Sequence, residues 1–296
     1  MSYTGQGTAT ALIGAPATRP SRHAGAILLV GPLVLYMAVF YAAPVLAMLA
    51  RSVLDPHLTL QNLVRLAGDE VFFHVFGNTL LTAVIVTLGT LLLGYPVALA
   101  LSRMRGMAAT VTLVVVLLPF WTSVLVRSYA WMVLLGRHGL INEALRGAAL
   151  IDAPLRMLNT AFAVYVAMIH ILLPYMILPI ASVLRQVDPA LPRAAASLGA
   201  SPWGVFEQVV LPLSMPGVIA GTLLVFVLSL GFYITPALVG GPRDMMLSQL
   251  IAQQVDLLNW PYAACLSATL LAATLLLLLL CQSLPGVRGA LRQSMR

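Results

Sequence analysis

Lysine is absent from the 296-residue sequence, and charged residues of every kind are scarce. They make up 8% of the chain, with 16 basic residues, all of them arginine, and 9 acidic ones. A water-soluble domain carries roughly 25% charged residues, which cover the surface that faces water. The shortage excludes an ordinary soluble enzyme, a disordered tail and a secreted disulfide scaffold. Without lysine, the chain also has no P-loop for ATP and no Schiff-base chemistry.

The sequence also gives little support for a disulfide bond, a metal site or nucleic-acid binding. The two cysteines, Cys265 and Cys281, lie in one apolar run. A helix would place them about 24 Å apart, beyond the reach of a disulfide. The sequence has no His-Glu-x-x-His motif, close cysteine pair or carboxylate cluster to hold a metal. We therefore expect no metal and no cofactor on this chain. Because the arginines are scattered singly, nucleic acid is not an expected partner.

Hydrophobic residues, in contrast, make up 60% of the chain. Apolar stretches of about 18 residues or more predict membrane helices, with lipid around them. The first stretch is much longer than the apolar core of a signal peptide, so we expect it to stay as an uncleaved span. The sequence predicts an all-α membrane protein with six transmembrane helices, at residues 24–50, 75–101, 107–125, 161–184, 213–238 and 261–284.

The arginines also predict the orientation of these helices. If the N-terminus is cytoplasmic, nine arginines lie on that side and six on the other, with Arg127 in or near a span. The positive-inside rule then favours both termini in the cytoplasm. We expect a single transmembrane domain at residues 24–284 between mobile cytoplasmic tails at 1–23 and 285–296. On the outer side, residues 58–76 and 142–158 predict short interfacial helices.

One segment, residues 186–208, is too polar to span the membrane. Asp188-Pro189 and Ser201-Pro202 are typical helix starts, and Gly199 is placed to end the first helix. Leu211-Pro212 is expected to end the second. The pattern predicts a helix–glycine–helix unit whose small alanine side chains fit a groove on another protein. A compact connecting loop is the alternative.

Ala194-Ala195 is followed after three residues by Gly199, then after nine by Val209, and after one more by Leu211-Pro212. This spacing resembles the signature of ABC importer permeases, whose coupling helix docks into a nucleotide-binding subunit. The resemblance implies an ABC importer permease (MetI-like) core, with ATP and Mg bound by separate ABC ATPase subunits. Arg193 stands where that family has Glu, so the contacts of that Glu are not carried over. The resemblance assigns ATPase coupling to Arg193, Ala194, Ala195, Gly199, Ala200, Pro202, Val209, Leu211 and Pro212.

Further stretches are similar to the permeases of spermidine/putrescine importers: Asn78-Thr79, 93–96, 118–142 and 231–242. This resemblance implies a polyamine pathway in the bacterial inner membrane that works by alternating access. It also implies two partners, a second permease subunit and a substrate-binding protein outside the membrane. Related permeases share much of this sequence, so another small organic cation, an amino-acid derivative or iron(III) remains an alternative cargo.

Prolines and glycines inside the spans indicate where the pathway lies. Pro119 predicts a kink in the third span, and Gly231 with Pro236 predicts a break at the outer end of the fifth. Broken helices are tolerated at membrane depth where they line a cavity or are buried in protein. The aromatic residues near these breaks suit cation–π contacts to an ammonium, or an ordinary interfacial belt. The candidates for the pathway or gate are Trp121, Arg127, Tyr129, Trp131, Tyr233, Thr235, Pro236 and Asp244.

Arg127 has two interpretations, since an ionisable group in or near a span is a functional candidate by default. It pairs with an outer acid such as Asp244 or Asp256 and holds a closed state, or it reaches the lipid headgroups. A cationic substrate would not be attracted to it. For His170, packing or a hydrogen bond between helices is favoured over a ligand role. Gly217 and Gly221 are spaced for close helix packing.

Two other function classes are less well supported. An intramembrane hydrolase needs a nucleophile and a base, and His170 has no serine motif to serve as its partner. An ion-driven carrier needs acidic residues in the membrane, and the six predicted spans contain no Asp or Glu. The sequence also shows no internal repeat of the kind that such carriers have. A transport subunit without catalytic residues of its own remains the best supported function.

Overall fold

The computed structural model describes residues 22–54 and 60–283, and over these ranges every regular element is a helix. The chain divides into two units, Met1–Met48 and Leu49–Arg296. The first unit contains α1 (Arg22–Met37), the π-helical turn η1 (Ala38–Ala42) and the start of α2 (Ala43–Leu54). Together, residues Val30–Leu54 are long and apolar enough to cross a membrane. The predicted tails lie almost wholly outside the described residues.

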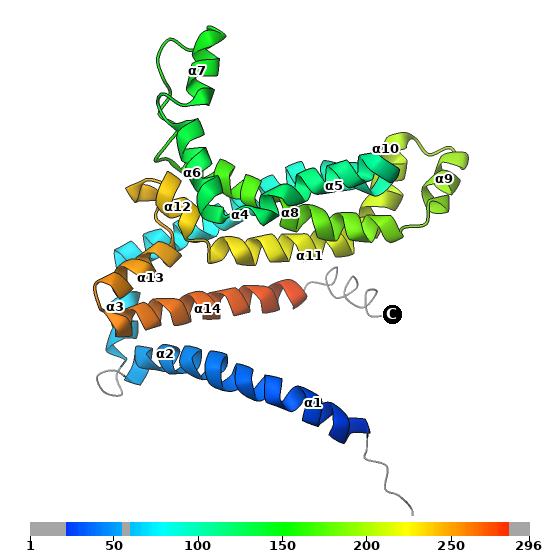
Figure 1. Cartoon of the computed structure of the whole chain (residues 1–296). Coiled ribbons are helices and arrows are strands. Elements are labelled where there is room, and N and C mark those ends of the chain that lie inside the picture. The colour runs from blue at the N-terminus through cyan, green and yellow to red at the C-terminus, as the bar shows by residue number, and fades with distance from the viewer. Residues whose placement is uncertain (1–21, 55–59, 284–296) are drawn as a thin grey trace, which may run out of the picture. The chain divides into compact units, whose positions relative to one another are not determined.

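The second unit is built on three long helices that pack against one another: α4 (Glu70–Arg103), α8 (Ala161–Gln186) and α11 (Leu211–Leu230). Figure 1 shows them running alongside each other. Their shared core is aliphatic and fully buried, as expected for helices that are apolar on the side facing their neighbours. Its members include Val86, Ala98, Met168, Leu172, Met176, Ile177, Ile180 and Val225.

Glycines allow α11 to approach α8 closely. A Cβ on Gly217 would lie 2.8 Å from the Pro179 carbonyl oxygen and 2.9 Å from the Ile180 Cα. At Gly221, a Cβ would lie 3.0 Å from the Met176 sulfur. The predicted close packing at these two glycines is therefore confirmed, and α8 is the helix that they contact.

The third predicted span, residues 107–125, is broken rather than kinked. Helix α5 (Gly106–Trp121) ends where Thr122 turns to an extended conformation, and α6 (Val124–Leu135) begins two residues later. The segments Gly106–Trp121 and Val124–Gly147 are bent by 97°. The predicted end of this span at Leu125 is therefore wrong, because the chain changes direction near Pro119, and Thr122 Oγ1 donates to the Pro119 carbonyl at 2.9 Å.

The fifth predicted span needs two corrections. Leu211-Pro212 does not end a short helix, since Pro202–Leu230 forms one continuous apolar helix. This run comprises α10 (Pro202–Val205), the π-helical turn η2 (Phe206–Val210) and α11. The Leu211 N–H bonds the Phe206 carbonyl in π-helical register, so the helix passes a proline that has no N–H to donate. At the far end, the predicted break is present: α11 stops at Leu230 and α12 (Ile234–Val239) begins after it, rather than one span reaching Leu238.

The remaining helices of the second unit are short, except for the last. They are α3 (Gln61–Ala67), α7 (Leu140–Gly147), α9 (Ala190–Ser197), the 3-10 turn η3 (Pro242–Asp244), α13 (Leu247–Asp256) and α14 (Trp260–Ser283). An expected interfacial helix is present as α3, within 58–76. The short helix expected within 142–158 is present as α7, with different bounds, because it begins at Leu140 and ends at Gly147. Among residues 22–54 and 60–283, five helices are long and apolar enough to span a membrane. If the bent pair forms one span there are six, the number that the sequence predicts.

Candidate functional site

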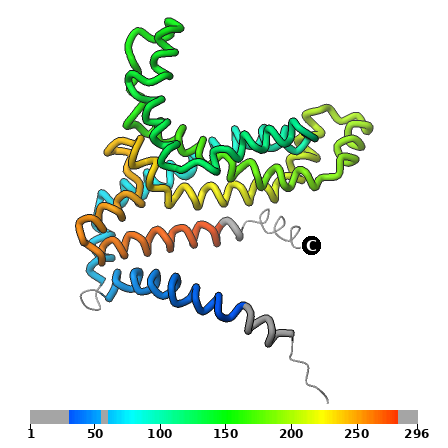
Figure 2. The backbone as a smooth tube through the Cα atoms, in the orientation of Figure 1, coloured from blue at the N-terminus to red at the C-terminus, as the bar shows by residue number. Residues whose placement is uncertain are grey.

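The segment after α8 folds as the helix–glycine–helix unit that the sequence predicts. Figure 2 shows the chain leaving α8, turning through α9 and α10, and returning along α11. The Asp188 carboxylate accepts the Ala190 N–H at 2.8 Å and starts α9. Ser201 Oγ accepts the Gly204 N–H at 3.1 Å and caps α10. Gly199 lies between them with φ +91°, a left-handed conformation that favours glycine.

The residues assigned to ATPase coupling occupy different parts of this unit. Arg193, Ala194 and Ala195 are in α9, and Ala200 follows the bend, while Pro202 starts α10. Val209 is in the π-helical turn, and Leu211 and Pro212 belong to the long helix behind it. The most exposed apolar side chains here are Leu198, at 89%, and Trp203, at 69%. Leu198 and Trp203 are not among the site residues predicted from the sequence. The position of Leu198 directly before Gly199 is the feature that indicates an exposed apolar residue at the bend. Leu198 and Trp203 give the segment an apolar surface of the kind that docks into a protein groove.

At the opposite end of the bundle, the two broken helices contact each other. Helix α12 packs on α6, and Ser128 Oγ and Thr235 Oγ1 share a hydrogen bond of 2.8 Å. Both side chains are fully buried, and Pro236 is buried beside them. Thr235 and Pro236 were predicted pathway residues, whereas Ser128 was missed. A polar residue within the apolar stretch before Trp131 was the available signal.

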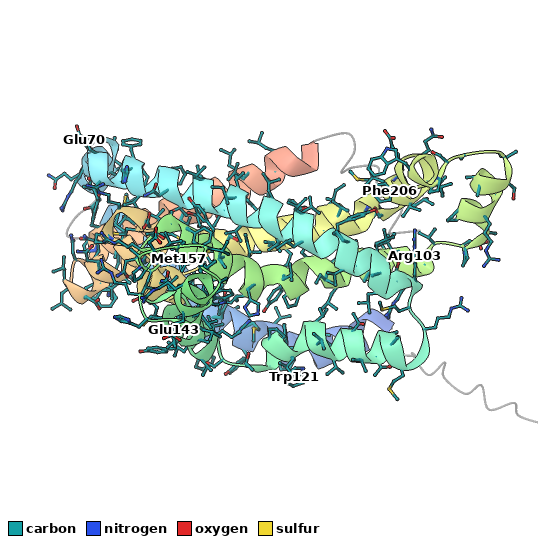
Figure 3. All side chains as sticks on the ribbon, turned by 90° about the horizontal axis from the view of Figure 1, so that it is seen from above. Glu70, Arg103, Trp121, Glu143, Met157 and Phe206 are labelled. Atoms are coloured by element: carbon teal, nitrogen blue, oxygen red, sulfur yellow. The ribbon has the colours of Figure 1, made fainter. Side chains whose placement is uncertain are left out.

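The four aromatic residues predicted to line the pathway or gate differ in their surroundings: three are exposed, and one is hydrogen-bonded to another helix. Trp121 is 85% exposed at the bend between α5 and α6, and Figure 3 labels its position. Tyr129 and Tyr233 are also exposed. Trp131 is different, because its indole Nε1–H donates to His170 Nδ1 at 3.2 Å across α6 and α8. The preferred interpretation of His170, a hydrogen bond between helices, is confirmed.

Arg127 lies on α6 with part of its guanidinium group enclosed. Its Nε and Nη1 atoms are buried and make no hydrogen bond within the part of the chain that the structure describes. Asp244, one of its two predicted partners, instead accepts the Gly241 N–H at 3.1 Å. The pairing of Arg127 with an outer acid therefore stays a prediction, as does its alternative, contact with the lipid headgroups. The buried donors are a feature that only the structure reveals.

Asn78 and Thr79 on α4 form hydrogen bonds with the segment between α12 and α13. Asn78 Nδ2 donates to the Arg243 carbonyl at 2.7 Å. Thr79 Oγ1 accepts the Leu247 N–H at 2.8 Å and donates to the Val75 carbonyl at 2.7 Å. Sequence resemblance singled out this pair but gave it no role. In the structure, it fixes the segment that contains Asp244.

A polar cluster connects α3, α4 and α14 at this same end. The Tyr262 hydroxyl donates to the Asp69 carboxylate at 2.6 Å, and the Arg65 guanidinium lies 4.4 Å from the centre of the Tyr262 ring. Asp69 also caps α4 by accepting the Val71 and Phe72 N–H groups at 2.9 and 3.3 Å. The hydrogen bond from Tyr262, with those from the backbone, holds the pKa of Asp69 below its ordinary value. No local sequence signal indicates this cluster, because Asp69 and Tyr262 lie 193 positions apart in the chain.

Over residues 22–54 and 60–283, no group of three or more His, Cys, Asp or Glu side chains is placed to hold a metal ion. The polar contacts described above join helices, and none has the nucleophile–base geometry of a hydrolase. The fold and site define a multi-pass membrane permease, with a helix–glycine–helix segment at one end of its bundle and two broken helices at the other.

The chain belongs to the family of binding-protein-dependent transport system inner membrane components, whose model matches residues 27–296. It is 37% identical over 222 residues to the spermidine/putrescine transport system permease protein PotB of Escherichia coli, covering 75% of this chain and 80% of PotB. The predicted all-α ABC importer permease fold and the assignment as a transport subunit rather than an enzyme are therefore confirmed.

Solved structures show the same fold. The crystal structure of a bacterial ABC transporter that imports the acidic polysaccharide alginate aligns with a TM-score of 0.72 and 18% identity, covering 88% of this chain and 93% of the other. A second structure of an alginate ABC transporter, in complex with an alginate pentasaccharide-bound periplasmic protein, aligns with a TM-score of 0.69 and 18% identity. It covers 88% of this chain and 92% of the other.

Proposed function

We propose that this permease forms, with a second permease subunit, the membrane pathway of a polyamine importer for spermidine and putrescine. The likeness to PotB, together with the sequence stretches it shares with polyamine permeases, supports this cargo. A substrate-binding protein delivers the polyamine on the outer side. Two ABC ATPase subunits, which bind ATP and Mg, supply the energy on the cytoplasmic side, where both termini of this chain lie.

The observation that carries the proposal is the α9–Gly199–α10 segment with its exposed Leu198 and Trp203. A chain without a P-loop needs a separate ATPase, and an exposed apolar surface at the end of a bundle suits such a partner. Closure of the ATPase pair on ATP draws two such segments together. The spans then change from inward-facing to outward-facing, because each ligand binds one of these two states more tightly.

The broken helices α6 and α12 form the outer gate in this proposal. Tyr129 on α6 and Tyr233, the residue before α12, present exposed rings. Rings of this kind attract an ammonium group through their electron-rich faces. Arg127 takes no part in binding a cation. Its buried, unpaired Nε and Nη1 are instead available to an acid in another conformation, which makes it a candidate for holding one state of the gate.

Uptake of labelled spermidine and putrescine tests the cargo. We expect a strain that lacks this permease to lose uptake and the complemented strain to recover it, with an excess of unlabelled polyamine competing. Labelled glycine betaine, choline and iron(III) serve as the alternative cargoes. Recovery of one of these without polyamine uptake would show that the importer assignment holds and the cargo is wrong. No recovery of any substrate, with the protein present in the membrane, would count against the transport role itself.

A further inference from the structure

A cavity of about 720 Å³ lies at the end of the bundle that carries α9. It is formed where α4 and α8 end, and its lining includes residues of the α4–α5 connection and the first turn of α9. Figure 3 shows Arg103, the last residue of α4, at the same end of the unit as Phe206 and opposite to Glu70. The cavity is thus at the level where two membrane-spanning helices leave the apolar part of the bilayer.

The cavity is strongly positive. Four arginines line it, from α4, the α4–α5 connection, α8 and α9: Arg103, Arg105, Arg185 and Arg193. The described residues that line it include no Asp or Glu. The acid nearest in sequence, Asp188, accepts the Ala190 N–H at the start of α9. All four arginine side chains are exposed, so an anion can reach them, and four like charges around one cavity repel each other until an anion enters.

Apart from Ser102, the other side chains that line the cavity are apolar. Leu99, Leu184 and Val210 form part of its wall. A free inorganic anion gains nothing from such a wall. An amphiphile does, because its charged head meets the arginines while its glycerol and first methylene groups lie against the aliphatic side chains. Basic pockets at the ends of membrane helices are suited to anionic lipid headgroups in this way.

An acidic side chain of the ATPase is the competing occupant. The apolar side chains that suit a protein partner, Leu198 and Trp203, do not line this cavity. The exposed apolar surface of Leu198 and Trp203 and the arginine-lined cavity are therefore different parts of the same unit, although Arg193, assigned to ATPase coupling, also lines the cavity. We propose that this cavity, the arginine pocket, binds the phosphate headgroup of an anionic phospholipid.

Because Arg193 lies on α9, a lipid bound in the arginine pocket would also affect the position of α9. Arg193 is the residue that stands where the resembling permeases have Glu, and it faces the pocket from α9 while Arg103 faces it from α4. A bound phosphate between them connects the α9 segment to the membrane surface through charge-assisted hydrogen bonds. The lipid then helps to hold α9 in place against the core helices.

Lipid binding to the full-length chain tests the proposal. The chain is delipidated in a neutral detergent and titrated with phosphatidylglycerol or phosphatidylcholine, and bound lipid is counted by native mass spectrometry. We expect phosphatidylglycerol to bind more tightly. The double variant Arg103→Gln/Arg105→Gln leaves the α9 segment untouched, and its affinity for phosphatidylglycerol is expected to fall by about fivefold for each arginine removed. The matched control is Arg146→Gln/Arg156→Gln, which removes the same charge from exposed positions outside the pocket and should bind as the unaltered chain does.

Several results would overturn the proposal. Equal affinity for the two lipids, or unchanged affinity in the Arg103→Gln/Arg105→Gln variant, would show that the pocket does not select an anionic headgroup. Inorganic phosphate that displaces phosphatidylglycerol at equal concentration would assign the pocket to a free anion. Loss of the bound lipid when the ATPase subunits assemble on the permease would assign it to an acidic group of that partner. Retention of the lipid in the assembled complex supports the proposal.

Discussion

Ser128 and Thr235 share a buried hydrogen bond of 2.8 Å, and through it α6 contacts α12 although 107 residues separate the two in sequence. Both helices follow a break in a membrane-spanning segment. The bond therefore joins the two irregular parts of the bundle to each other rather than to a regular helix.

Thr235→Val removes one side of this bond and keeps the shape of the side chain. Ser128 Oγ still donates to the Val124 carbonyl at 2.9 Å, so no donor is left unpaired and the expected loss of stability is about 1 kcal/mol. Thermal unfolding of the purified chain, combined with uptake, measures the effect. Ser128→Ala should cost more, about 1–3 kcal/mol, because the buried Thr235 hydroxyl then loses its acceptor. The double variant should cost less than the sum of the two single variants. Additive losses would mean that the bond contributes nothing.

Leu198→Asp tests the docking surface without threatening the fold. Because Leu198 is 89% exposed, we expect normal membrane insertion and thermal stability, with loss of transport and of copurification with the ATPase. Leu150→Asp, at an exposed leucine in the loop after α7, is the matched control. If the Leu198 variant transports normally and retains its ATPase, this surface is not the contact.

Gly199→Ala tests the bend between α9 and α10. Its φ of +91° is strained for any residue with a Cβ, at a cost of about 1–2 kcal/mol. The strain is local, so we expect the long helices to stay folded while uptake falls. Gly147→Ala adds a Cβ in open space at the end of α7 and should leave uptake unchanged. The two uptake rates, normalised to protein in the membrane, give the comparison.

Gly217→Ala tests the approach of α11 to α8. The added Cβ would meet backbone atoms at 2.8 and 2.9 Å, and backbone cannot give way as the end of a flexible side chain can. We expect a loss of about 1–3 kcal/mol from overpacking, seen as a lower unfolding temperature. Gly77→Ala, in α4 with nothing near its Cβ, should be neutral or stabilising. Equal effects in the two variants would contradict the close contact.

The Asp69 cluster predicts a dependence of stability on pH. Since the folded state lowers the pKa of Asp69, its contribution is present above the ordinary pKa of an unfolded aspartate, about 3.9. It is lost as the pH falls through the lower, folded value. Tyr262→Phe, which removes the hydrogen bond that lowers this pKa most, should flatten the acid end of the stability curve. Asp152→Asn, at an exposed loop position, is the control, and thermal unfolding between neutral and acid pH provides the measurement.

The long apolar segments and the bend at Gly199 follow from local signals in the sequence, whereas the ends of the third and fifth spans do not. Long apolar runs, helix caps and a glycine after an alanine-rich turn each act within a few residues. The route of the chain past Pro212 does not follow from such signals. A proline next to a polar segment favours a helix end, and only the shift to π-helical hydrogen bonding at Phe206–Val210 lets the helix continue.

Contacts between distant polar residues were also beyond prediction. Asp69 and Tyr262 are 193 positions apart, and each alone is an ordinary helix cap or an ordinary interfacial tyrosine. Arg127 was recognised as unusual because it lies near an apolar stretch. Its two buried unpaired nitrogens depend on the bend between α5 and α6, whose size a proline alone does not specify.

The continuous helix from Pro202 to Leu230 has a mechanical consequence. At 1.5 Å per residue, its 29 residues extend about 43 Å, and it stays helical from the α9–α10 bend to the end of α11 although Pro212 and Pro216 donate no N–H. It therefore acts as a lever. If the helix tilts by about 5° about its end near Trp203, its other end at Leu230 moves by about 4 Å. A small movement of the helix at one membrane surface therefore produces a movement at the other surface.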